Sequence, residues 1–173
     1  TNTTDGYFSN VHSLRNTYGA DMVGLIVENG GAYCGLANAI MATQANAFQV
    51  TDRSCATGYY SFGHEFGHLQ GARHDVYVDN STTPFPYGHG YAHRGSTTAQ
   101  RWRTIMAYNN YCSVVGYDCT RLQWWSNPTK IWQGAPMGVV NSSENYKVLN
   151  LTDTTVANFR TAIIGTDFTN NFN

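Results

Sequence analysis

The chain has 173 residues, enough for one domain with its own hydrophobic core. Hydrophobic residues make up 42% of it and charged residues only 12%, which excludes a disordered chain. A formal net charge of -1 gives no excess of basic residues for binding nucleic acid. No apolar stretch approaches the ~18 residues that a membrane span needs.

The N-terminal part of the chain predicts one helix followed by strands. Residues 7–19 carry apolar side chains at helical spacing and end on Gly19, a typical helix stop. Residues 22–27 are typical of a short buried strand that ends at a Gly-rich turn. Residues 36–42 and 47–51 are also strand-like, with weaker patterning.

The rest of the chain predicts two helices separated by a turn-rich region. The first helix begins near Tyr59 and is closed by Gly71, whereas residues 76–104 are rich in turns and hard to assign. A final amphipathic helix fits residues 154–164, with Asp153 as its N-cap. Early strands and later helices favour an α/β (α+β) sandwich cut by a cleft.

Four cysteines, Cys34, Cys55, Cys112 and Cys119, permit three pairings into two disulfides. Sequence order favours Cys34–Cys55 and Cys112–Cys119, and each short loop would contribute about 2–3 kcal/mol in the chain-entropy model. Four free thiols in a cytosolic protein are the alternative. A polar surface rich in Asn, Gly and Tyr favours export, and because no signal peptide opens the chain, an exported chain would be a mature form.

Residues 64–75 concentrate the residue types that bind metal, in the order HEFGHLQGARHD. Residues four apart project from one face of a helix, so His64 and His68 can reach a single ion. Gly71 can adopt the left-handed conformation that ends a helix, and this reversal would bring in His74 as a third ligand. Three neutral imidazoles leave one position of a catalytic zinc ion open for water, with Glu65 as the general base.

The length of this pattern bears on its specificity. H-E-x-x-H alone is only suggestive, and the competing interpretation is a helix that carries unrelated histidines. A glycine and a third histidine at fixed offsets make that coincidence a poor explanation.

The pattern H-E-x-x-H-x-x-G-x-x-H resembles that of the metzincin clan of zinc proteases. That clan carries a methionine turn beneath the metal, which residues 103–108 (RTIMAY) resemble, with Met106 as the apolar floor. Asp75 follows the third histidine as in the adamalysin or reprolysin-like branch. Tyr108 stands two positions after Met106, as in astacins and serralysins, which implies a zinc ligand or an oxyanion donor. A buried tyrosine with a structural hydrogen bond is the alternative for Tyr108.

Further segments are similar to the bacterial peptidyl-Asp metalloendopeptidase-like proteins, from about residue 11 onward: residues 14–21, 34–37, 67–75, 125–128, 148–151 and 156–160. The resemblance implies a single catalytic domain over residues 1–173. Its upper part, residues 1–75, would hold a twisted mixed sheet and the active-site helix. Its lower part, residues 76–173, would hold the methionine turn and a C-terminal helix, with a cleft between the two parts. The strand, helix and strand that usually open metzincins find no room here, so we expect processing or a shortened fold.

The same resemblance implies a substrate site on both sides of the cleft. Residues 36–41 would form an antiparallel edge strand, where Leu36, Ala37 and Asn38 would bind an extended peptide. An edge strand without a ligand is the alternative. The pocket for the residue after the scissile bond would be walled by Trp124, Trp125 and Ser126. Preference for cleavage before acidic residues implies an arginine there, with these candidates: Arg121, Arg103 and Arg101.

These features together predict a secreted zinc metalloendopeptidase, a hydrolase with one catalytic Zn²⁺. Its partners would be a protein or peptide substrate and its own pro-segment or N-terminal fragment, without nucleic acid or a membrane span. The alternatives are a non-catalytic zinc-scaffold binding or toxin module, and an amidase acting on cell-wall peptide. Calcium has little support, because Asp79, Asn80 and Asp118 lack the spacing of a calcium loop.

Overall fold

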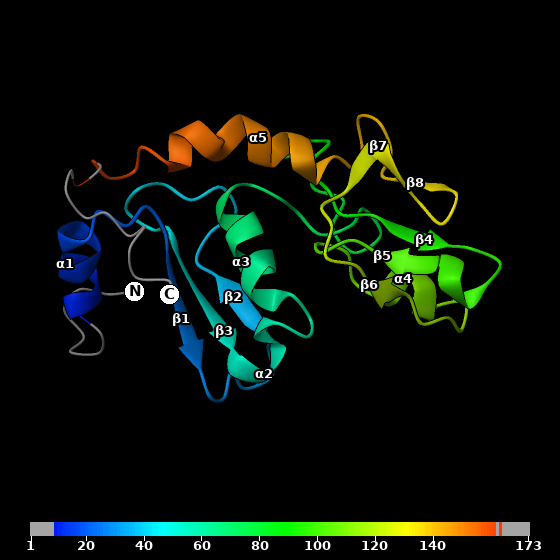
Figure 1. Cartoon of the computed structure of the whole chain (residues 1–173), viewed down its shortest axis with the longest axis horizontal. Coiled ribbons are helices and arrows are strands. Elements are labelled where there is room, and N and C mark those ends of the chain that lie inside the picture. The colour runs from blue at the N-terminus through cyan, green and yellow to red at the C-terminus, as the bar shows by residue number, and fades with distance from the viewer. Residues whose placement is uncertain (1–8, 162, 164–173) are drawn as a thin grey trace, which may run out of the picture.

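A three-stranded sheet and the helix packed on it occupy the N-terminal half of the chain (Figure 1). The computed structural model describes residues 9–161 and 163. The strand order is β1-β3-β2, in which β1 runs parallel and β2 antiparallel to the central β3. The elements of this half are α1 (Asn10–Thr17), β1 (Val23–Val27), β2 (Gly35–Ala37), β3 (Phe48–Asp52), α2 (Arg53–Ala56) and α3 (Ser61–Leu69).

The first predicted elements are present, but the predicted burial of β1 is wrong. Helix α1 ends next to Gly19, which has a φ of 59°. Leu25 and Ile26 of β1 are 38% and 52% exposed. Strand β1 is an edge strand paired only with β3 in the described part of the chain, so its apolar side chains are not covered as those of a central strand would be.

Strand β2 is the opposite edge of the sheet and is antiparallel to β3, as the predicted edge strand over residues 36–41 requires. It ends at Ala37, earlier than predicted. Helix α3 packs against β2 and β3. This packing sets the edge strand beside the helix that carries the histidine motif.

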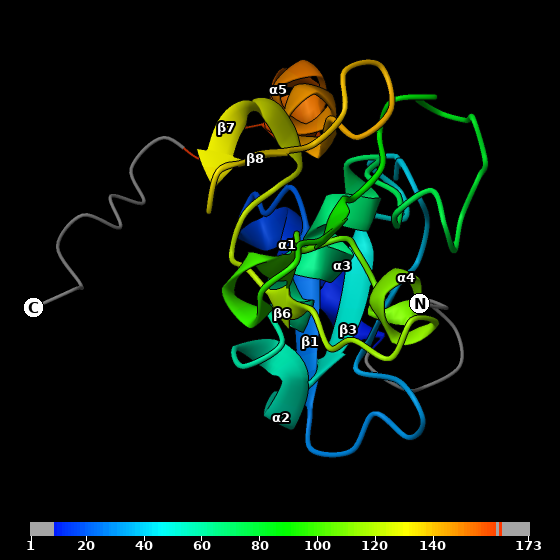
Figure 2. The same ribbon diagram turned by 90° about the vertical axis from the view of Figure 1, so that its right-hand side faces the viewer.

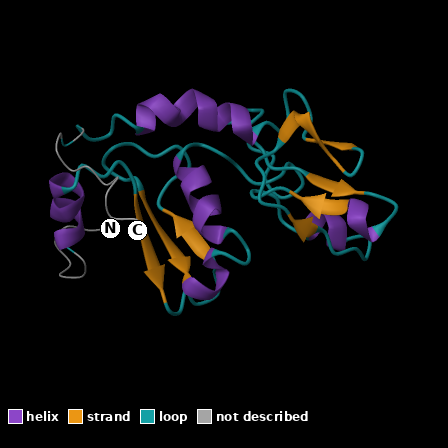
Figure 3. Ribbon diagram, in the orientation of Figure 1, coloured by secondary structure: helices purple, strands orange, loops and turns teal. Residues whose placement is uncertain are grey.

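The C-terminal half begins with a long irregular segment after α3, drawn as loop in Figure 3. A second three-stranded sheet follows, with order β4-β5-β6, and then a β7–β8 hairpin. The predicted clustering of strands in the early part of the chain is therefore wrong, because residues 76–104 contain two of these strands. The elements are β4 (Ala92–Arg94), η1 (Thr98–Gln100), β5 (Arg101–Arg103), α4 (Asn110–Ser113), β6 (Thr120–Arg121), β7 (Asn127–Trp132) and β8 (Ala135–Met137).

The last helix, α5 (Asn145–Val156), begins earlier than the sequence predicts. Figure 2 shows α5 and the β7–β8 hairpin together on the same side of α3. The predicted N-cap Asp153 lies inside α5, and part of the predicted range, residue 162 and residue 164, lies outside the described residues. The buried stripe of α5 includes the polar Asn145 and Thr152, which a search for apolar spacing does not count.

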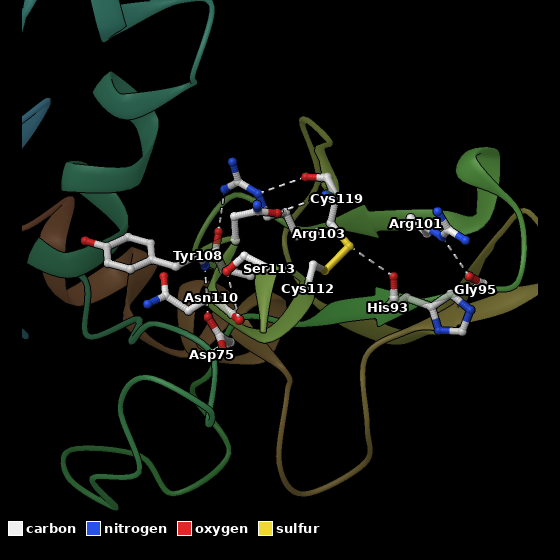
Figure 4. The surroundings of a disulfide bond; sticks show 12 residues. Asp75, His93, Gly95, Arg101, Arg103, Tyr108, Asn110, Cys112, Ser113 and Cys119 are labelled. Carbon is white, nitrogen blue, oxygen red and sulfur yellow. Dashed lines mark hydrogen bonds between the residues drawn. A yellow bond between two sulfur atoms is a disulfide. The ribbon is translucent and has the colours of Figure 1, made fainter. Parts of the chain in front are cut away.

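Two disulfides hold the loops beside these elements. Cys34 is bonded to Cys55 and Cys112 to Cys119, the pairing that sequence order favours. The first joins the start of β2 to α2, and the second closes the loop from α4 to β6 (Figure 4).

None of the described helices is long and apolar enough to cross a bilayer.

Candidate metal centre and cleft

Three histidine side chains, two from α3 and one from the turn after it, converge on one point. His64 and His68 lie four residues apart on the helix, and His74 follows after the chain reverses at Gly71, whose φ is 102°. The Nε2 atom of His74 lies 3.1 Å from Nε2 of His64 and 3.0 Å from Nε2 of His68. The helix spacing and the glycine turn thus bring the three predicted ligands together.

Backbone carbonyls orient two of these rings. His64 donates its Nδ1–H to the carbonyl of Ile105 at 2.9 Å, and His68 donates its Nδ1–H to the carbonyl of Ala72 at 2.8 Å. With the proton held on Nδ1, each Nε2 presents a lone pair toward the centre of the group. Such supporting bonds are typical of histidines that bind a metal.

The three rings are neutral at neutral pH, as ligands of a cation must be. Burial lowers the pKa of His64, His68 and His74, in the last case to about 4, with the nearby His68 as a second cause. Neutral rings whose lone pairs face one another repel unless a cation lies between them. Zinc with Zn–N bonds of 2.0–2.1 Å in tetrahedral geometry would hold its nitrogens about 3.3 Å apart. The residues present therefore fit a zinc ion.

Glu65 is the carboxylate beside this centre. Burial raises its pKa to about 7, although the Ala37 backbone N–H donates to it and the positive Arg121 opposes the rise. Gly35 of β2 makes room for it, because a Cβ at that position would lie 2.6 Å from both Cγ and Oε1 of Glu65. Sequence reasoning missed this role of Gly35, since it depends on the contact between β2 and α3.

The methionine turn packs against the helix that carries His64 and His68. Met106 has no exposed surface and packs with Ala72 and Ile105, and Tyr60 and Trp125 pack around them. The same turn supplies the Ile105 carbonyl that orients His64. Met106 thus lies in an apolar cluster attached to the metal-binding helix, as the predicted floor would.

Asp75 and Tyr108 link the third histidine to this turn. The Oδ2 atom of Asp75 accepts a hydrogen bond from the Tyr108 backbone N–H at 2.9 Å (Figure 4). The ring of Tyr108 is 4.2 Å from that of His74, centroid to centroid, and Tyr108 remains 39% exposed. The alternative of a buried tyrosine is therefore wrong, and the side chain lies at the open side of the centre.

His89 contacts the backbone of His74. Its Nδ1 atom lies 2.8 Å from the His74 carbonyl oxygen and its Nε2 atom 3.0 Å from that of Ser81, and its own carbonyl accepts from Ser126 Oγ at 2.6 Å. Ser126 Oγ in turn accepts from the backbone N–H of Asn145. Ser126 has no exposed surface, so its hydroxyl belongs to this network and not to a pocket wall. No spacing in the sequence signals these contacts.

A cavity of about 290 Å³ opens beside the centre. His64, Glu65 and Tyr108 line it on the side of the centre, and Arg103 and Arg121 line it from β5 and β6.

Several predicted pocket residues do not line this cavity. Arg101 donates to the carbonyls of Gly95 and Ser96 and covers the ring of Tyr117 instead. Neither Trp124 nor Trp125 is part of the cavity lining. Trp125 packs under Met106, whereas Trp124 is 46% exposed and stays a predicted contact.

The predicted residues of the edge strand differ in accessibility. Leu36 is 63% exposed, and Ala37 contributes the backbone N–H that binds Glu65. Asn38 lies just beyond the strand, where its side chain donates to the carbonyl of Asn46. Asp79, which lacks the spacing of a calcium loop, accepts from Arg73 through Oδ2 and from the Ser81 N–H through Oδ1, so both oxygens have partners.

Three imidazoles from a helix and the turn after it, with a carboxylate one position on and a methionine turn beneath, define a zinc metallopeptidase site. Residues 1–121 match the family model described as metallo-peptidase family M12. The chain therefore belongs to this family, which uses zinc.

Two bacterial relatives are similar over most of the chain. A peptidyl-Asp metalloendopeptidase of Stenotrophomonas maltophilia (strain R551-3) is 50% identical over 159 residues, which are 92% of this chain and 36% of the relative. One of Xanthomonas campestris pv. campestris (strain ATCC 33913 / DSM 3586 / NCPPB 528 / LMG 568 / P 25) is 51% identical over 158 residues, 91% of this chain and 35% of the relative. The chain thus spans about a third of the length of these curated relatives.

A solved structure also resembles the fold. The structure described as a chaperone-substrate complex aligns with a TM-score of 0.65 and 24% sequence identity. The alignment covers 88% of this chain and 23% of that one. This likeness concerns the fold alone.

Proposed function

We propose that the chain is a secreted, zinc-dependent endopeptidase that hydrolyses peptide bonds in protein or peptide substrates. The observation that carries this proposal is the convergence of three neutral imidazoles beside a buried carboxylate. Membership of metallo-peptidase family M12 and the two relatives named peptidyl-Asp metalloendopeptidase support it. Two disulfides support an oxidising, extracellular location.

His64, His68 and His74 would hold the ion through Nε2. Zinc bound there would act as a Lewis acid on the scissile carbonyl and acidify a water molecule. Glu65 takes a proton from the attacking water and returns it to the leaving amine.

The open edge of β2 supports binding of an extended peptide. Backbone groups on a free strand edge can pair with substrate in a way that does not depend on side chains. Leu36 is exposed on this strand, and Ala37 lies next to Glu65, so a peptide paired here would pass the centre. Tyr108, at the open side, would donate its hydroxyl to the developing oxyanion. The relatives' name supports a preference for peptides with aspartate, cleaved before the acidic residue.

The test compares wild type with Glu65→Gln for zinc content and for cleavage of casein. Both proteins should bind about one zinc ion, while cleavage should fall at least ~10²-fold in the variant, the usual contribution of a general base. A chelator should abolish the wild-type activity. Undiminished cleavage by Glu65→Gln would refute the assigned base, and zinc binding without any cleavage by wild type would favour a binding module.

A further inference from the structure

Two arginines stand side by side at the cavity next to Glu65. Arg103 of β5 and Arg121 of β6 are register partners on neighbouring parallel strands, and both line the cavity. Like charges on adjacent strands destabilise a sheet unless an opposite charge compensates them. Within residues 9–161 and 163, neither guanidinium forms an ion pair with a carboxylate. Asp75 and Asp118 stabilise the charge of Arg103 only from a distance, and Glu65 does the same for Arg121, so both guanidinium groups lack a directly bonded carboxylate.

Backbone carbonyls fix the position of both guanidinium groups. Arg121 donates from Nη1 to the carbonyl of Tyr59 at 2.9 Å and from Nη2 to that of Ala107 at 3.2 Å. Arg103 donates to the same Ala107 carbonyl at 2.7 Å and to that of Cys119 at 3.0 Å (Figure 4). The buried Nε of Arg121 has no hydrogen-bond partner. Each Nη group of Arg121 carries a second N–H besides the one bonded to a carbonyl, and these N–H groups are the donors that a ligand in the cavity could meet.

Arg121 keeps its charge at neutral pH. Burial, together with the positive charge of Arg103, lowers its pKa to about 10. Both effects disfavour the charged form, and the negative charge of a carboxylate in the cavity would offset them. Arginine offers planar, paired donors to a carboxylate, which makes such hydrogen bonds stronger than neutral ones.

We propose that Arg121 binds the side-chain carboxylate of an acidic substrate residue next to the scissile bond, and that Arg103 acts as a positioning residue behind it. This assignment rests on the proposed peptidase function. The cavity joins the arginines to His64, Glu65 and Tyr108, so a side chain that enters it belongs to a residue adjacent to the bond under attack. The competing role is purely structural, in which both arginines only anchor the Ala107 carbonyl of the methionine turn.

The experiment uses peptide pairs that differ only by Asp or Asn after the scissile bond. Hydrogen bonds to a charged group contribute about 1.5–3 kcal/mol, so wild type should favour the Asp peptide in kcat/KM by about 10- to 150-fold. Arg121→Gln should bring that ratio close to one, and Arg121→Lys should restore part of it. A ratio that stays at the wild-type value in Arg121→Gln would overturn the assignment.

Arg101→Gln is the matched control. Arg101 lies on the same strand as Arg103 but binds Gly95 and Ser96 and covers Tyr117, outside the cavity. Its substitution should leave the Asp-to-Asn ratio at the wild-type value. A purely structural arginine at position 121 would instead lower kcat/KM for both peptides equally and leave their ratio unchanged.

Two further measurements separate the assignment from the proposed function. Zinc-loaded Glu65→Gln, titrated with the two peptides by calorimetry, should bind the Asp peptide at least ~10-fold more tightly, because the arginines remain. If wild type cleaves neither peptide but this binding difference persists, the peptidase proposal fails and the carboxylate site stands. If Arg121→Gln does not fold, the wild-type protein alone tests the assignment. Equal kcat/KM of the wild type for the Asp and Asn peptides would overturn it.

Discussion

At the scale of single residues, the site depends on residues that do not bind the metal themselves. Gly35 leaves space for Glu65, and the carbonyl groups of Ile105 and Ala72 orient the rings of two of the three ligands. His89 contacts the backbone carbonyl of the third ligand, His74. A substitution at such a position moves a functional group without removing it. Small displacements of this kind can cost about 10²-fold in rate.

Gly35→Ala should therefore separate metal binding from catalysis. The added Cβ would lie 2.6 Å from Glu65 Cγ and Oε1, so the carboxylate must shift while the three histidines stay in place. We expect zinc content near one ion per chain and kcat reduced by about 10²-fold. Metal analysis and peptide cleavage measure the two quantities.

Gly63→Ala provides the control for that substitution. Gly63 lies on α3, one residue before His64, and a Cβ there would meet nothing within 4 Å. Its activity should remain at the wild-type level, with a gain in helix stability of about 0.5–1 kcal/mol. If Gly35→Ala were as active as Gly63→Ala, the close approach of β2 to Glu65 would have no catalytic importance.

The metal ligands could be predicted from the sequence because their geometry is local. His64 and His68 share a helix face, and one glycine accounts for the return of the chain to His74. Gly35 and His89 could not be assigned their roles, since each acts through a contact with a distant segment. Arg101 and Arg121 were both candidates in the sequence, and the fold distinguishes them, since Arg121 lines the cavity and Arg101 binds Gly95 and Ser96.

At the scale of elements, the segment after α3 needs its own anchors because it has little regular structure. Arg73 and Asp79 form an ion pair at 2.8 Å with side chains only 15% and 17% exposed. Burial alone would raise the pKa of Asp79, but the hydrogen bonds from Ser81 and Arg73 outweigh it and lower the pKa to about 2. This pair fixes the loop that begins just after the third histidine.

Asp79→Asn should destabilise the protein in a pH-dependent way. The folded pKa lies below the model-peptide value of 3.8, so the stabilisation is complete above about pH 4 and is lost as the pH falls toward 2. We expect a loss of roughly 1–2 kcal/mol in the free energy of unfolding at pH 7, and a smaller difference near pH 3. Urea unfolding at several pH values measures it.

Glu28→Gln is the matched control for that prediction. Glu28 also pairs with an arginine, Arg53, at 2.6 Å, but both side chains are largely exposed. Solvent screens such a pair, so little change in stability is expected at any pH. A difference between wild type and Asp79→Asn that did not vary with pH would contradict the assigned ion pair.

At the scale of the whole molecule, α5 joins parts that are distant in sequence. It crosses above α3 in Figure 1, and the segment after it returns to α1, where Arg160 binds Asp21 and Asn16. The sequence predicts an amphipathic helix near this end but places it too late. Its buried Asn145 is held by the Gly88 carbonyl, a partner that only the folded chain supplies.

The central claim is that three imidazoles hold one zinc ion and leave a position open for water. A crystal structure of the zinc-loaded protein, with an anomalous difference map at the zinc edge, tests it most directly. We expect one peak about 2.1 Å from Nε2 of His64, His68 and His74, with Glu65 outside bonding distance. A peak elsewhere, or a fourth protein side chain bound to the ion, would contradict this account.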